Sequence, residues 1–75
     1  MLVYKLSQTE NRGYDTYDAC VVIAPTEYRA KELSIEKLCE FSDKRWCKDI
    51  DKIQADLIGG SALNEQIVLA SYDAG

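Results

Sequence analysis

The hydrophobic pattern of this chain predicts an α+β fold, a two-layer sandwich in which one helical segment covers one face of a four-stranded sheet. Four segments alternate apolar and polar residues as half-buried strands do, and a segment rich in helix formers lies between the second and the third. The chain has 75 residues, which is one small domain, residues 1–75. The element order is therefore ββαββ, with an antiparallel or mixed sheet.

The first two strands are predicted over residues 1–8 and 14–24, because apolar and polar residues alternate in both. Residues 9–13 between them collect turn formers and end at Gly13, the expected position of a positive φ. The chain should therefore return antiparallel to itself. The only proline, Pro25, ends the second strand, because its ring removes a donor from the hydrogen-bond ladder.

The helical segment is predicted over residues 26–41, with Thr26 as the N-cap. Its apolar residues do not form a single stripe. On a helical projection they fall into two groups, Ala30, Leu33 and Phe41 on one side and Tyr28, Ile35 and Cys39 on the other. Either the helix is buried on two faces, or it breaks near Ser34 into two shorter helices.

The third and fourth strands are predicted over residues 53–58 and 66–72, with Gly59-Gly60-Ser61 breaking the third. The polar loop of residues 41–49 contains one large aromatic, Trp46, which we expect to anchor the loop to the core. The sheet face away from the helix should carry the more polar alternates and be open for a partner.

Charge and hydropathy argue against two classes of partner. Thirteen acidic and nine basic residues give a net charge of −4, the wrong sign for direct binding to nucleic acid or to an anionic membrane. The N-terminal residues lack the apolar stretch of a secretory signal, and no segment approaches the roughly 20 apolar residues of a membrane span. We therefore expect a cytoplasmic protein.

The reactive side chains do not form a pattern typical of catalysis or metal binding. Cys20, Cys39 and Cys47 are far apart, and the chain has no histidine to complete a tetrahedral zinc site. Because their number is odd, we expect free, buried thiols. No nucleophile motif and no phosphate-binding loop is present. We therefore expect no enzyme, no catalytic residue, no cofactor and no metal.

An acidic row is predicted on the helix, where Glu32, Glu36 and Glu40 recur every four residues and Asp43 extends the row if the helix is continuous. One interpretation is an acidic face that imitates nucleic-acid phosphates and occupies a basic groove of a protein partner. The other is a solvated helix face. Three carboxylates span about 12 Å, over which duplex DNA carries roughly seven charges.

A second candidate surface comes from the dipeptide Tyr-Asp, which occurs as Tyr14-Asp15, Tyr17-Asp18 and Tyr72-Asp73. Tyrosine offers rigid contact area with a polar tip and is enriched at protein interfaces. If the second and fourth strands meet, these side chains form one partner-binding patch. In the alternative interpretation, Tyr17 packs in the core and the aspartates finish turns.

Three segments carry a family resemblance: GYDTYDACVVIA at 13–24, TEYRAKEL at 26–33 and IVLASYDAG at 67–75. They resemble a family of small, mostly uncharacterised bacterial and phage-associated proteins with the patterns GYDTYDSAVVxA, an acidic helix start, a loop tryptophan and a final ASFNAG. The resemblance covers nearly the whole chain. It departs from the pattern at Ala19-Cys20, at SIEKLCEF (34–41) and at the ending SYDAG. It implies a phage or prophage setting rather than a mechanism.

Resemblance, size and charge together favour a non-catalytic phage-type inhibitor in the bacterial cytoplasm. Such a protein would bind a host defence complex that processes nucleic acid, as anti-CRISPR proteins do, partly through the acidic row. The alternative is a small protein-protein adaptor or homo-oligomeric accessory protein with no role linked to nucleic acid. In that case the open sheet face or an edge strand would pair with a partner or with a second copy as a homodimer.

Overall fold

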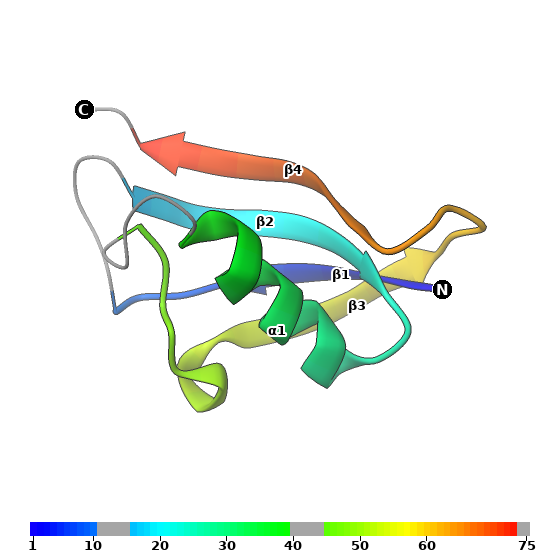
Figure 1. Cartoon of the computed structure of the whole chain (residues 1–75), viewed down its shortest axis with the longest axis horizontal. Coiled ribbons are helices and arrows are strands. Elements are labelled where there is room, and N and C mark those ends of the chain that lie inside the picture. Colours follow the sequence, from blue (N-terminus) through cyan, green and yellow to red (C-terminus); the bar gives the residue numbers. More distant parts are fainter. Residues whose placement is uncertain (11–15, 40–44, 74–75) are drawn as a thin grey trace.

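One helix lies across one face of a four-stranded antiparallel sheet, as the computed structural model shows (Figure 1). The structure describes residues 1–10, 16–39 and 45–73. The elements are β1 (Leu2–Ser7), β2 (Thr16–Ala24), α1 (Glu27–Leu38), the short 3₁₀ helix η1 (Ile50–Lys52), β3 (Gln54–Gly60) and β4 (Gln66–Asp73). The predicted α+β class and the order ββαββ are confirmed, and the sheet is antiparallel throughout.

The strand order is β3-β1-β2-β4, so the two N-terminal strands form the centre of the sheet and the two C-terminal strands form its edges. β1 and β2 pair directly from Leu2 opposite Ala24 to Ser7 opposite Ala19. β3 then adds to the outer side of β1, and β4 to the outer side of β2. The central strands supply most of the buried sheet residues because they have neighbours on both sides.

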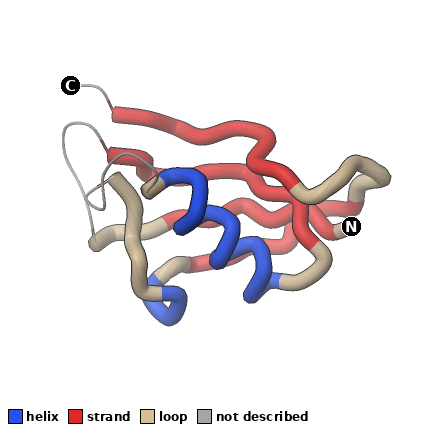
Figure 2. Tube along the Cα trace, viewed as in Figure 1, coloured by secondary structure: helices blue, strands red, loops and turns tan. Residues whose placement is uncertain are grey.

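The core lies between the sheet and α1, which runs along one face of the strands (Figure 2). β1 contributes Tyr4 and Leu6, and β2 contributes alternate residues that include Val22. Ile23, on the other face of β2, is also buried. From the helix side, the core receives Ala30, Leu33 and Leu38, and the segment after α1 adds Trp46, Cys47 and Ile53.

Trp46 is fully buried, which confirms its predicted role as the anchor of its loop. Its indole Nε1 donates a hydrogen bond of 2.9 Å to the Oγ of Ser34, which is also fully buried. The Ser34 hydroxyl in turn donates to the backbone oxygen of Lys31 at 2.6 Å. Ser34 thus satisfies the only polar atom of the tryptophan side chain inside the core.

The helix is continuous through Ser34, so the predicted alternative of a break near this residue is wrong. Ser34 is buried at the centre of the helix face that meets the sheet, and this polar residue separates the apolar positions in the sequence. Thr26 is the N-cap, as predicted, and its side chain accepts a hydrogen bond from the Arg29 backbone nitrogen at 3.1 Å. Phe41, predicted in the same segment, lies outside the described residues.

β3 differs from its prediction at both ends. The short helix η1 precedes it, and the strand continues through Gly59 and Gly60, where a break was expected. Gly60 pairs with Leu2, and the Ser61 backbone nitrogen donates to the Met1 oxygen at 2.8 Å. Pairing with β1 therefore outweighs the weak strand preference of glycine. Gly13, the predicted turn glycine, lies outside the described residues.

Candidate functional site

Among the residues that the structure describes, no helix lies over the sheet face opposite α1, and residues from all four strands line up across it in rows. The strand register places Asp56, Lys5, Val21 and Leu69 side by side, on β3, β1, β2 and β4 respectively. We call this set the large row. The adjacent set, which we call the small row, contains Gln54, Ser7, Ala19 and Ser71 on the same four strands.

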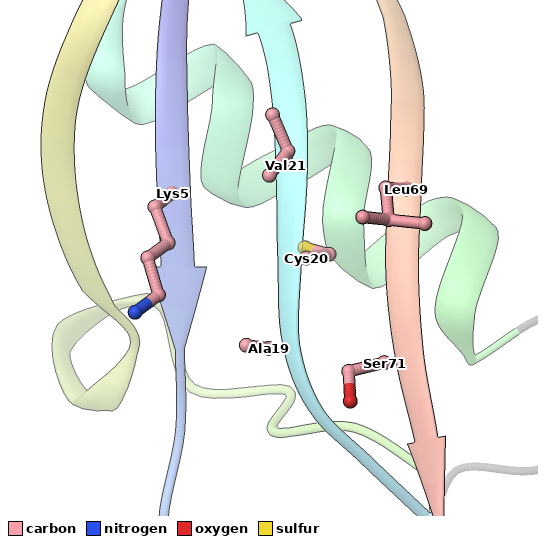
Figure 3. A pocket seen from close by; sticks show the side chains of 6 residues that line it. All are labelled: Lys5, Ala19, Cys20, Val21, Leu69 and Ser71. Carbon is pink, nitrogen blue, oxygen red and sulfur yellow. The ribbon is translucent and has the colours of Figure 1, made fainter.

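A depression of about 170 Å³ lies on this face where the two rows meet, and α1 lies behind the strands in this view (Figure 3). It is lined by Lys5, Ala19, Cys20, Val21, Leu69 and Ser71. The depression lies where the small row supplies the methyl group of Ala19 and the short side chain of Ser71, beside the longer side chains of the large row.

The outward position of Leu69 depends on a β-bulge. Val21 pairs with Leu69 and Val22 pairs with Ile67, so Val68 is an extra residue in β4. Ile67 and Ala70 therefore both pack against the core, although they are three residues apart. Leu69, 67% exposed, and Val68, 53% exposed, are left in solvent. An exposed large apolar side chain of this kind is more informative than a buried one.

The sequence did not single out the large and small rows. In β4, strict alternation would place Leu69 on the same face as Ile67, inside the core. The bulge that reverses this is not encoded by a glycine or proline, the residues that signal irregular strands. The expectation that the open face carries the more polar alternates holds for Lys5 and Ser7 of β1 and for their β3 partners in the rows, whereas β2 and β4 place Val21 and Leu69 there.

Two of the three Tyr-Asp pairs are brought together by the sheet. Tyr17 is opposite Tyr72 and Thr16 is opposite Asp73 in the pairing of β2 with β4. Tyr17 is half-buried and packs against the core, as the structural interpretation of the pairs expected. Asp18 is the extra residue of a second bulge and is exposed. Tyr14 and Asp15 lie outside the described residues, so a patch made by all three pairs stays a prediction.

The acidic row of α1 is partly neutralised by Arg29. Its Nη1 lies 2.7 Å from the Oε1 of Glu32 and 3.5 Å from the Oε1 of Glu36. The other two predicted members of the row, Glu40 and Asp43, lie outside the described residues. Glu32 and Glu36 therefore share one guanidinium, and the described part of the row has less net charge than the sequence spacing suggests.

Arg29 also ties α1 to the segment before β4. Its Nε and Nη2 donate to the two carboxylate oxygens of Glu65 at 2.9 and 2.7 Å, a bidentate arrangement that fixes the orientation of both groups. The hydrogen bonds from Arg29 hold the pKa of Glu65 below its ordinary value, and Glu65 and Glu32 raise the pKa of Arg29. This pair positions the start of β4 relative to the helix.

The three cysteines are free thiols, as predicted, although Cys39 is only partly buried. Cys20 lies in the core, and burial raises the pKa of its thiol to about 12. Among the described residues, no three histidine, cysteine, aspartate or glutamate side chains are grouped closely enough to hold a metal ion. The same part of the chain contains no helix long and apolar enough to cross a membrane.

Comparison with known proteins adds no relative. No family model matches the chain, and neither a curated protein nor a solved structure matches it.

Proposed function

We propose that this chain is a non-catalytic protein-binding module whose contact surface is the open face of its sheet. The observation that carries the proposal is the exposure of Leu69 beside Val21 and the depression, on the one broad sheet face that α1 does not cover. This is the adaptor interpretation of the sequence, now with a specific surface. Water contact with such side chains is unfavourable, and covering one of them fully contributes about 1.5–3 kcal/mol.

The composition of the face supports contact with protein. The two rows hold one charge of each sign, Lys5 and Asp56, which are direct neighbours on adjacent strands. The remaining members are small, apolar or uncharged polar side chains. Protein interfaces are depleted in charged residues at their centre, and the rows hold only this one pair, on β3 and β1, whereas Val21 and Leu69 on β2 and β4 are apolar.

A pull-down from bacterial lysate at low and high salt tests the proposal, with tagged wild-type protein and with the variant Leu69→Lys. We expect a bound protein that resists high salt and is lost with Leu69→Lys, because a lysine ammonium would have to be buried at the interface. Tyr28→Lys is the matched control. Tyr28 is similarly exposed, 61%, but lies on α1, on the other side of the molecule. Retention of the partner by Leu69→Lys would contradict the proposal.

The second candidate function is inhibition of a host defence complex that processes nucleic acid, through the acidic row. The observation that favours it is the net charge of −4 together with the exposure of Glu36 and of Glu27 on α1. The pairing of Arg29 with Glu32 and Glu36 weakens it. In the same pull-down, this function predicts a partner that washes off in high salt, because screening weakens contacts between exposed charges. The triple variant Glu32→Lys, Glu36→Lys, Glu40→Lys would abolish its capture.

A further inference from the structure

We infer that the occupant of the open face is a second copy of this chain, so that two sheets stack face to face with a helix on each outer side. The inference rests on the proposed function and names the partner of that same surface. Its basis is that the large row and the small row are adjacent and parallel to one another, and that on β1, β2 and β4 a longer side chain of the large row lies beside a shorter one of the small row.

A twofold axis that runs across the strands, between the two rows, places each row of one copy over the other row of the second copy. Val21 then lies over Ala19 of the second copy, and Leu69 lies over its Ser71. The long side chains of each copy fill the depression beside the short side chains of the other. The contact is reciprocal, as a twofold interface requires, and side chains of two stacked sheets interdigitate in this way at a sheet separation of about 10 Å.

The same axis leads to no like-charge contact between the rows. Lys5 lies over Ser7 of the second copy, and Asp56 lies over its Gln54, so neither charged residue meets its own counterpart. Each copy has a net charge of −4, but the two facing rows are neutral. The electrostatic repulsion between the two copies therefore comes from charged residues outside the two rows, where solvent and salt screen it.

Sedimentation analysis of the purified chain from micromolar to millimolar concentration tests the inference. We expect a monomer–dimer equilibrium that does not weaken as salt is added, because burial of apolar side chains drives it. Leu69→Lys should raise the dissociation constant about thirtyfold or more, as hot-spot substitutions do. Because the dimer is twofold symmetric, the substitution is present twice in the interface.

A second variant, Ala19→Leu, fills the small row rather than removing part of the large row. It should weaken the dimer as well, because Val21 of the second copy loses its space. Ala19 is on the open face, so the longer side chain extends into solvent in the monomer, and the far-UV circular dichroism should match that of the wild type. Tyr28→Lys is again the control and should dimerise as the wild type does.

A chain that stays monomeric throughout the concentration range would overturn the inference, as would a dimer that either Leu69→Lys or Ala19→Leu leaves unchanged. A dimer that is unaffected by these substitutions would have its contact elsewhere, for example along the free edge of β4. The proposed function is tested separately. A monomer whose salt-resistant partner in the pull-down still depends on Leu69 would keep the protein-binding face and reject only the second copy as its occupant.

Discussion

Ser34 and Trp46 determine how the segment after the helix is attached to the core. Because both side chains are fully buried, the 2.9 Å hydrogen bond between them has no water to replace it. Ser34→Ala would leave the indole nitrogen without its acceptor and should lower the free energy of unfolding by about 1–3 kcal/mol. Urea unfolding followed by Trp46 fluorescence measures this. Ser71→Ala, at an exposed position, is the control and should change stability by less than about 0.5 kcal/mol.

Of the two partners in this hydrogen bond, the sequence predicts only the tryptophan. A single large aromatic in a polar loop indicates an anchor, and Trp46 is one. Its acceptor could not be predicted, because a serine among helix formers indicates a possible break as readily as a buried hydroxyl. The choice between a helix break and a buried hydroxyl depends on the contact of Ser34 with Trp46, which lies twelve residues later in the sequence.

Cys20 allows a second prediction for a single residue. Burial holds its thiol in the neutral form, with a pKa of about 12, whereas Cys39 is partly exposed. Because the thiolate is the nucleophile, iodoacetamide at pH 8 should modify Cys39 well before Cys20 in the folded protein. Peptide mapping by mass spectrometry after timed quenching measures both rates. Equal rates in the folded state would show that the core around β2 opens readily.

At the level of elements, the contact between α1 and the start of β4 depends on Arg29 and Glu65. The folded-state pKa of Glu65 is lowered from 4.5, so the stabilisation is present above the unfolded pKa and is lost as pH falls through the folded pKa. The wild type should be more stable than Glu65→Gln at pH 7, and the difference should shrink below about pH 4. Urea midpoints at several pH values measure it. A difference independent of pH would show that charge does not contribute.

The start of α1 gives a further prediction at this scale. The Thr26 side chain accepts from the Arg29 nitrogen, so Thr26→Ala should destabilise the chain by about 1 kcal/mol. Thr26→Ser keeps the acceptor and is the control. If the two variants had equal stability in urea unfolding, the hydrogen bond of this cap would not contribute.

Element types and order could be predicted because they follow from local patterns: alternation in four segments, one run of helix formers, and a proline between strand and helix. Element ends were predicted less well. β3 continues through two glycines because β1 pairs with them, and this pairing joins residues almost sixty positions apart in the sequence. The candidate face could not be predicted, since the bulge at Val68 turns Leu69 outward without a sequence signal.

At the scale of the whole molecule, the helix covers one side of the sheet and leaves the other side with exposed apolar side chains. For a domain of 75 residues this matters, because a small domain has little surplus stability to spend on an unfavourable surface. Interdigitation of the large row with the small row of a second copy would convert the two-layer monomer into a four-layer dimer.

Isotope-filtered nuclear Overhauser spectroscopy on a millimolar mixture of labelled and unlabelled chains tests the face-to-face dimer most directly, because it records only contacts between copies. The account predicts contacts between the Val21 methyl groups of one copy and the Ala19 methyl group of the other, and between Leu69 and the β protons of Ser71. The absence of intermolecular contacts on this face, or contacts confined to the outer edge of β4, would contradict it.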